Sequence, residues 1–356
     1  MVYKTCLTLL AVLILLLAAC QPSTGIPADQ PQTLSIMTHD SFSMSTELVN
    51  KFEQDNHASL VFIQGGDAGS SLNRLILTSV GSPTPEVDVF YGLDNTFLSR
   101  ALEQELFEPY QPDALAAVPD QFKLDSTFQV VPINYGDVCI NYDKAWFADN
   151  QLTLPNSLEE LANPQYASLL VVENPATSSP GLSFMLASIA HFGEEGWLDW
   201  WQALKDNGVT IVSDWETAYY TNFSGSSGRG PQPMVVSYAS SPAAELIFAE
   251  TELSESPTAS LVAPGMCWRQ VEFAGILNNT PNLALAEKFI DFMLSQDFQE
   301  DVPMQMFVYP VLPDAVLPED FVIASQIPEN TASLDTELIA ANRDIWVNQW
   351  ADLMIN

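Results

Sequence analysis

A unit of three parts repeats along this chain: a short apolar run, a polar turn, and a segment whose apolar residues recur at helical spacing. Alternating strand and helix patterns are typical of α/β proteins, in which helices cover both faces of a parallel or mixed sheet. The expected strands are residues 33–38, 59–63, 87–90, 169–172, 209–212 and 234–238. The expected helices lie near residues 48–52, 72–77, 97–102, 182–191, 197–204, from 243 onward, 283–294 and 334–354. The predicted fold class is α/β, with mixed sheets flanked by helices.

Two further apolar segments do not fit the repeating unit. Residues 129–142 are interrupted by Asn134-Tyr135-Gly136, and this pattern predicts either a strand pair or a crossing between two domains. Residues 270–276 are the candidate return crossing.

The N-terminus has the pattern of an export signal. Lys4 precedes an apolar run over residues 6–19, and the small residues Ala18 and Ala19 lead into Cys20. This run is shorter than the roughly 20 apolar residues of a membrane span. We therefore predict a lipoprotein signal peptide over residues 1–19, lipidation of Cys20, and a tether over residues 20–32. Diacylation of Cys20 would anchor the protein to the bilayer at the outer face of the cytoplasmic membrane, in a periplasm or at a cell surface.

Composition excludes several classes of function. The formal net charge of −34 repels phosphate backbones, so we expect no binding to nucleic acid. A hydrophobic content of 47% is sufficient for a packed core. The cysteines and histidines show no metal-ligand spacing, so we expect no metal site. Cys139 and Cys267 lie in strand-like runs, and they are either a disulfide or two buried thiols.

Ligands of open α/β sheets bind beyond the carboxyl ends of the strands, near helix N-termini. Four turns meet this condition: Asp40-Ser41, Asp94-Asn95, residues 177–181 and residues 240–242. The last two each place Ser-Pro at a helix start, where backbone N–H groups are available to a ligand as well as to a cap.

Aromatic residues gather near these turns, namely Trp215, Tyr219, Tyr238 and Phe307. Aromatic faces together with carboxylates suit a flat cation, through stacking and cation–π attraction. The motifs Gly-x-Ser-x-Gly, Gly-Lys-Ser/Thr in a phosphate loop, and His-Glu-x-x-His are absent from the sequence. An extracytoplasmic esterase that uses Ser41 or Ser179 is the alternative from a different functional class.

An ordered set of short motifs then relates the chain to a known family. These motifs are Thr38-His39-Asp40-Ser41-Phe42, Ser71-Leu72-Asn73-Arg74-Leu75, Gly92-Leu93-Asp94-Asn95, Tyr142-Asp143-Lys144, Thr177-Ser178-Ser179-Pro180-Gly181-Leu182, Trp215-Glu216-Thr217-Ala218-Tyr219, Ser237-Tyr238 with Ser241-Pro242, Tyr309-Pro310-Val311 and Arg343-x-x-Trp346-x-x-x-Trp350. From about residue 33 to 352 the chain resembles the thiamine-binding proteins of ABC importers, which belong to the class II periplasmic solute-binding proteins.

The resemblance implies two α/β lobes that are joined by two crossing strands and close on a ligand between them. The first lobe would comprise residues 33–131 and 274–312, and the second lobe residues 132–273. A helical segment, 313–356, would pack on the lobes. The implied function is capture of thiamine or its phosphates by a monomer and delivery to the membrane permease, without catalysis and without a cofactor.

The same resemblance implies the ligand-binding residues. Asp40 and Asp94 would face the cleft. Residues of the turn 177–181 would hold the hydroxyethyl or phosphate end of the ligand. Aromatic side chains would contact the rings, and Ser241 would add a polar contact. The full expected set is Asp40, Ser41, Asp94, Thr177, Ser178, Ser179, Gly181, Trp215, Tyr219, Tyr238, Ser241 and Phe307.

This chain departs from the family pattern at three positions. It has Ala243-Ala244 where the family carries a second tyrosine after Ser-Pro, Phe307 in place of a tryptophan, and Asp137 in place of an aromatic residue. Losing a stacking face costs about 1 kcal/mol, so a lower affinity or a related pyrimidine ligand is an alternative. Another alternative is a ferric-ion-binding protein of the same class, in which Tyr219-Tyr220 would bind the iron.

Overall fold

A computed structural model describes residues 30–79, 82–227 and 229–355. The chain divides into the units Met1–Gln32 and Thr33–Asn356, and the elements below belong to the second, apart from the first residue of one strand. The predicted signal peptide, Cys20 and most of the tether lie outside the described residues. Within the described part, no helix is both long and apolar enough to cross a membrane.

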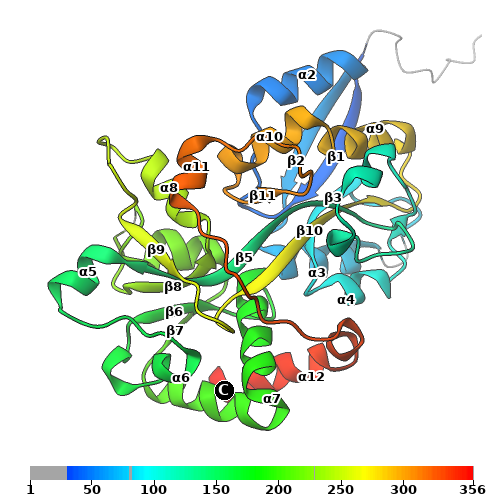
Figure 1. Ribbon diagram of the computed structural model, residues 1–356. Coiled ribbons are helices and arrows are strands. Elements are labelled where there is room, and N and C mark those ends of the chain that lie inside the picture. Colours follow the sequence, from blue (N-terminus) through cyan, green and yellow to red (C-terminus); the bar gives the residue numbers. More distant parts are fainter. Residues whose placement is uncertain (1–29, 80–81, 228, 356) are drawn as a thin grey trace, which may run out of the picture. The chain divides into compact units, whose positions relative to one another are not determined.

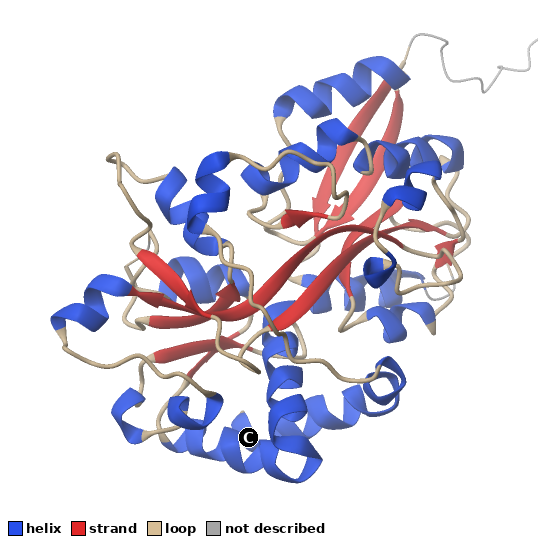
Figure 2. Cartoon of the chain, viewed as in Figure 1, coloured by secondary structure: helices blue, strands red, loops and turns tan. Residues whose placement is uncertain are grey.

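The described strands form one mixed sheet, in agreement with the α/β prediction (Figures 1 and 2). They are β1 (Gln32–Thr38), β2 (Ala58–Gln64), β3 (Val89–Asp94), β4 (Phe107–Glu108), β5 (Val131–Asp143), β6 (Leu170–Glu173), β7 (Thr210–Val212), β8 (Met234–Tyr238), β9 (Thr258–Leu261), β10 (Trp268–Leu277) and β11 (Tyr309–Pro310). The main order is β2-β1-β3-β10-β5-β8-β6-β7. Strands β1 and β3 pair in parallel, as do β8, β6 and β7, whereas β10 and β5 run antiparallel to their neighbours.

Helices flank the sheet (Figure 2). They are α2 (Thr46–Asn56), α3 (Ala68–Ser79), α4 (Leu98–Leu102), α5 (Lys144–Asp149), α6 (Leu158–Leu161), α7 (Ser179–Asp206), α8 (Ser241–Ile247), α9 (Leu283–Met293), α10 (Gln296–Gln305), α11 (Glu319–Ala324) and α12 (Thr336–Met354). Short helical turns are η1 (Asp113–Ala117), η2 (Asp120–Phe122), η3 (Pro164–Tyr166) and the π-helical η4 (Thr217–Asn222).

Strands β5 and β10 are the long central pair of the sheet (Figure 1). They pair from Trp268 opposite Val138 to Ala274 opposite Val131. The strand-pair alternative for residues 129–142 is therefore wrong, because β5 continues through Asn134-Tyr135-Gly136 without a turn. Glycine is needed here for space: a Cβ at Gly136 would lie 2.7 Å from a ring carbon of Tyr238.

Helix α7 combines the two helices that we expected at 182–191 and 197–204. The backbone breaks its helical conformation at Gly193, where φ is 72° and ψ is 171°. A positive φ favours glycine over residues with a Cβ. Both halves have residues buried in the core, and the break at Gly193 confirms the prediction of two helical segments.

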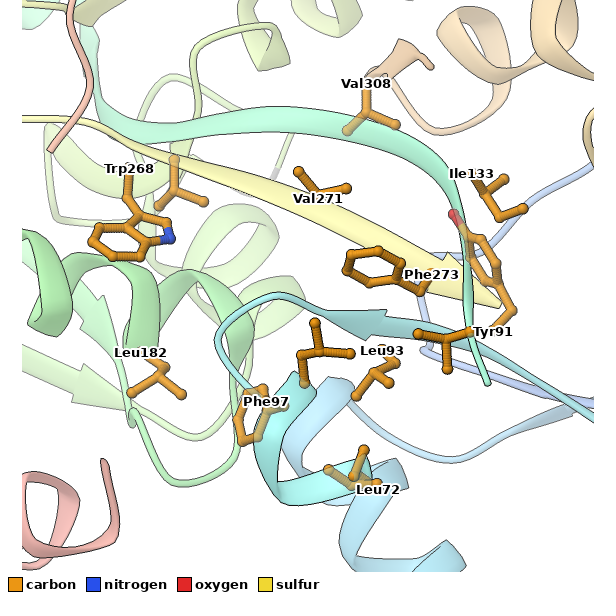
Figure 3. Packing of buried hydrophobic residues seen from close by; sticks show 14 of the residues in the cluster. Leu72, Tyr91, Leu93, Phe97, Ile133, Leu182, Trp268, Val271, Phe273 and Val308 are labelled. Atoms are coloured by element: carbon orange, nitrogen blue, oxygen red, sulfur yellow. The ribbon is translucent and has the colours of Figure 1, made fainter. Parts of the chain in front are cut away.

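One large hydrophobic core extends across the sheet. Figure 3 shows Leu93 of β3 and Phe273 of β10 in this core with Leu72 of α3 and Leu182 of α7. At its other end, Trp350 of α12 meets Trp201 of α7 edge to face, with ring centroids 5.4 Å apart. The C-terminal helix is thus held by the core.

The structure joins Cys139 of β5 to Cys267, which immediately precedes β10, in a disulfide. Of the two alternatives that the sequence left open, the bonded one is present. Their Cα atoms are 4.3 Å apart, and both cysteines are fully buried. The bond closes a loop with a sequence separation of 128 and ties together the two central strands.

We expect the Cys139→Ala/Cys267→Ala double variant to lower the free energy of unfolding by about 2–5 kcal/mol, because the unfolded chain loses a long-range restraint. Urea denaturation would measure the loss. A reducing agent should lower the stability of the natural protein by a similar amount and leave the double variant unchanged. An equal response of both proteins to the reductant would contradict a structural disulfide.

Candidate functional site

A cavity of about 340 Å³ lies at the edge of the sheet where β1, β2, β7 and β8 end. Its walls come from loops and helix starts that follow these strands, and its floor comes from Glu272 of β10. A further wall is the segment after α10, residues 305–308. This is the edge at which parallel strands place ligand sites.

Most of the predicted site residues line this cavity. They are Asp40, Ser41, Ser179, Trp215, Tyr219, Tyr238, Ser241 and Phe307. The remaining four, Asp94, Thr177, Ser178 and Gly181, are not among the lining residues. Contact of any of the twelve with a ligand stays a prediction.

The aromatic wall is centred on Trp215. The indole stacks on Tyr219 with ring centroids 4.9 Å apart and an interplanar angle of 19°. Its Nε1 donates to Ser237 Oγ at 2.9 Å, and this hydrogen bond fixes the ring in its plane. Tyr238 meets the indole nearly edge-on at 6.4 Å. Tyr219 therefore covers one face of Trp215, and the indole presents a rigid aromatic surface to the cavity.

Two carboxylates border the cavity from the loops after β1 and β2. Asp40 Oδ1 accepts a hydrogen bond from Gly66 N at 3.1 Å. Asp67 accepts from Ala68 N at 2.7 Å and from Trp215 N at 3.2 Å, so it joins the start of α3 to the aromatic wall. Burial raises the pKa of Asp67, and hydrogen bonds partly offset this effect.

The floor carries a third carboxylate, Glu272, which is 7% exposed. Tyr91 donates to Glu272 Oε2 at 3.0 Å, and His39 Nε2 lies 3.5 Å from Oε1. Gln270 donates to the hydroxyl of Tyr238 at 2.9 Å and connects this floor to the aromatic wall. Burial, together with Glu272, raises the pKa of Tyr238 well above its ordinary value, which keeps the phenol neutral.

The sequence prediction missed four titratable residues of the cavity: His39, Asp67, Glu216 and Glu272. Asp67 had the same signal as Asp40, because it follows the turn after a predicted strand. Glu272 had a different signal, a charged residue in the middle of an apolar strand. Neither signal says that both side chains reach one cavity.

Asp94 is not among the residues that line the cavity. The sequence placed it in a turn, whereas in the structure it is the last residue of strand β3. It is fully buried and accepts from Thr96 N at 2.7 Å and from the hydroxyls of Thr96 and Ser179. Burial raises the pKa of Asp94 to about 6, against the effect of these hydrogen bonds.

Of the other three residues outside the lining, Ser178 is fully buried, and Thr177 and Gly181 make close contacts with neighbouring segments. The hydroxyl of Thr177 donates to the carbonyl of Ser213 at 2.6 Å. Gly181 packs against β6, where a Cβ would lie 2.5 Å from the carbonyl oxygen of Glu173. These residues position the start of α7, whose residues Ser179 and Pro180 reach the cavity.

Phe307 has a strained backbone, with φ at 54°. This region is unfavourable for a residue with a bulky side chain and costs about 1–3 kcal/mol. The hydroxyl of Ser240 donates to the carbonyl of Phe307 at 2.6 Å. The rings of Phe248 and Phe307 pack together with their centroids 5.3 Å apart. These contacts hold the Phe307 ring at the cavity.

Among the described residues, no group of three or more His, Cys, Asp or Glu side chains is arranged to hold a metal ion. The cavity offers aromatic surface, carboxylates and hydroxyls, which suit an organic ligand.

Comparison with known proteins places the chain in a family. Residues 84–327 match the family described as bacterial extracellular solute-binding protein. The chain belongs to this family. The two-lobed architecture with mixed sheets and flanking helices that the sequence predicted is confirmed by solved structures of periplasmic binding proteins.

Individual relatives are more specific. This solute-binding protein is 31% identical to the thiamine-binding periplasmic protein of Brucella suis biovar 1, over 91% of this chain and 93% of that one. It is 32% identical to the protein of the same name from Salmonella typhimurium, over 91% and 94%. It is also 25% identical to iron uptake protein A1 of Synechocystis, over 90% and 88%.

Two solved structures illustrate the range of the fold. A periplasmic thiamin binding protein has a TM-score of 0.79 and 28% identity, and the match covers 94% of this chain and all of that one. A periplasmic binding protein from Actinobacillus pleuropneumoniae with bound fructose-6-phosphate has a TM-score of 0.76 and 18% identity, with 91% and 98% covered. The second likeness shows the shared fold alone.

The pKa of Asp94 makes a prediction about stability. Its folded pKa of about 6 exceeds the ordinary 3.8, so the folded state holds this proton more tightly than the unfolded state does. The associated stability is present below about pH 4 and is lost as the pH rises through 6. Relative to Asp94→Asn, the natural protein should lose about 3 kcal/mol of unfolding free energy between pH 4 and pH 7. Urea denaturation of both proteins across this pH range would measure the loss. A difference in unfolding free energy between the two proteins that does not change with pH would contradict the raised pKa of Asp94.

Proposed function

We propose that this protein captures thiamine outside the cytoplasm and delivers it to the membrane permease of an ABC importer, without catalysing a reaction. The observation that carries the proposal is the combination of a rigid aromatic wall at Trp215 with several carboxylates around one cavity. Thiamine joins a permanently charged thiazolium ring to a flat aminopyrimidine. Stacking and cation–π attraction suit both parts, and the carboxylates supply counter-charge.

The relatives support this ligand over others that the fold accepts. The curated proteins with about 31% identity over nine-tenths of the chain are named thiamine-binding. The iron uptake relative is more distant. In this chain the rings of Tyr219 and Tyr220 stand at 84° to each other, and Tyr219 is buried beneath Trp215. This arrangement favours an aromatic ligand over a ferric ion.

The lobes proposed for closure are residues 33–131 with 274–312 and residues 132–273. Hydrogen bonds between these segments support a mechanism in which they close around the ligand. Trp215 N donates to Asp67, and Gly69 N and Ser70 N donate to the carbonyl of Thr177 at 3.0 and 3.3 Å. The proposed third segment, 313–356, contributes α12, which packs on α7 and α4.

An esterase is a weaker proposal. The hydroxyl of Ser179 donates to the buried carboxylate of Asp94, and among the described residues no histidine is hydrogen-bonded to it. Lipidation at Cys20 would keep the binding protein close to its permease.

Thiamine should bind the purified full-length protein and quench its tryptophan fluorescence. Replacing Trp215 with alanine removes the stacking surface, so we expect the dissociation constant to rise at least about tenfold, equivalent to about 1.4 kcal/mol. Isothermal titration calorimetry would measure it without depending on fluorescence.

Trp146→Ala is the matched control, because Trp146 is also partly buried but lies on α5 and not among the cavity residues. Its affinity for thiamine should equal that of the natural protein. If neither thiamine nor its phosphates bind, and ferric ion produces a visible charge-transfer band, the protein is an iron binder instead.

A further inference from the structure

Three of the described residues that line the cavity are exposed to solvent, namely Glu216, Tyr220 and Phe248. The other lining residues are buried or partly buried. A side chain that both lines a cavity and faces solvent lies at the mouth of that cavity, so these three residues mark the entrance. Two of them are aromatic: Tyr220 is 45% exposed and Phe248 is 68% exposed. The mouth therefore offers aromatic surface as well as a carboxylate.

The ring of Tyr220 is held in place by its neighbours. It meets Trp215 edge to face, with ring centroids 5.5 Å apart and ring planes at 80°. It meets Tyr219 in the same way, at 5.3 Å and 84°. Tyr219 is itself buried and stacked on Trp215. Tyr220 therefore extends the rigid aromatic wall as far as the mouth of the cavity.

The ring of Phe248 is held by fewer contacts. Phe248 is the C-cap residue of α8, with φ at −96° and ψ at 12°. Residues 250–255, which follow it closely, are all exposed and belong to no helix or strand. Among the described residues its ring packs against one other aromatic ring, that of Phe307, with centroids 5.3 Å apart and planes at 73°. A single edge-to-face contact leaves the Phe248 side chain free to adopt another rotamer.

The space within reach of the Phe248 ring lies over Ala244. The N–H of Phe248 donates to the carbonyl of Ala244 at 2.9 Å, so the two residues stand one turn apart on the same face of α8. Side chains on a helix lean toward its N-terminus and cover the preceding turn. Ala244 lines the cavity, and its side chain ends at Cβ. The part of the cavity beside Ala244 is therefore open to the ring of Phe248.

We propose that Phe248 is a ligand-binding residue whose ring turns over the mouth of the cavity once a ligand is inside, and so slows release of the ligand. This inference rests on the proposed function. In its present position the Phe248 side chain is mostly in contact with water. Contact with the flat rings of thiamine would remove apolar surface of both partners from water, and this favours the covered position. The ligand would then be enclosed by Phe248 as well as by the wall at Trp215.

Phe248 also connects ligand release to movement of the proposed lobes. Helix α8 lies within the proposed lobe 132–273, whereas Phe307 belongs to the lobe formed by 33–131 and 274–312. The contact between the rings of Phe248 and Phe307 therefore joins the two proposed lobes at the mouth. The hydroxyl of Ser240, just before α8, donates to the carbonyl of Phe307 and links the same two segments. Separation of the lobes would withdraw Phe248 from the mouth and free the ligand.

The test measures the rates of binding and release by stopped-flow tryptophan fluorescence, on the full-length protein over a series of thiamine concentrations. Phe248→Ala should raise the dissociation rate constant at least about tenfold and change the association rate constant less than about threefold, because the ring acts after the ligand has entered. Phe248→Tyr keeps an aromatic ring and should release thiamine within about twofold of the natural rate.

Ile323→Ala is the matched control. Ile323 is an apolar residue with 63% exposure, close to that of Phe248, and it does not line the cavity. It lies on α11, which packs against α8 (Figure 1). This variant should bind and release thiamine at the natural rates, and circular dichroism would check that each variant is folded.

Fluorine NMR reports the position of the ring independently of affinity. With p-fluorophenylalanine at position 248, the fluorine signal shifts between light and heavy water as long as the ring is in contact with solvent. Addition of thiamine should reduce this solvent shift, because the ring leaves the water and covers the ligand.

The outcomes separate this inference from the proposed function. If the natural protein binds thiamine and Phe248→Ala releases it at the natural rate, the role of Phe248 is overturned and thiamine capture stands. An equal acceleration in Ile323→Ala, or a solvent shift at position 248 that thiamine does not change, would also overturn that role. Failure of the natural protein to bind thiamine would overturn the proposed function and this inference with it.

Discussion

The antiparallel pairing of β5 with β10 is the constraint on which the rest of the structure depends. Strand β10 lies between β3 and β5, so its register decides which of its side chains face the cavity. Glu272 and Gln270 point to the cavity side, while the alternate residue Arg269 pairs with Asp137. A slip by one residue would exchange these faces and put Val271 or Phe273 where Glu272 now stands. The disulfide at Cys139 and Cys267 lies at the end of this pairing and restrains it.

A site without a cation carries an energetic cost in the ligand-free protein. Buried carboxylates are destabilising unless hydrogen bonds or opposite charges compensate them. Asp94 is compensated by Thr96 and Ser179 and still has a raised pKa. Glu173, at the end of β6, has no hydrogen-bond partner for either carboxylate oxygen, and burial raises its pKa well above the ordinary value. A cationic ligand would supply counter-charge to the carboxylates that line the cavity, and these do not include Asp94 or Glu173.

Local sequence patterns predicted the parts of this structure that local interactions determine. The apolar runs marked β1, β2 and β8 almost to the residue, and strand ends led to Asp40, Ser179 and Ser241. The short strands β4, β9 and β11 were missed because each is defined by its partner in the sheet and has too few residues for a periodic pattern. Asp94 was placed in a turn because Gly92 reads as a turn residue, yet pairing with β10 extends β3 through it. Glu272 could not be assigned, because its role depends on strands far away in the sequence.

Charge and shape in the cavity are coupled through one residue, Asp67. Its carboxylate lines the cavity and also accepts the backbone N–H of Trp215, 148 positions along the chain. A carboxylate accepts hydrogen bonds more strongly when it is ionised. A cation in the cavity favours the ionised form of Asp67, whose pKa burial otherwise raises. The ligand's charge therefore strengthens the contact that holds the indole against which the ligand's own rings stack. The carboxylates and the aromatic wall of the cavity therefore favour the same kind of ligand, a flat cation.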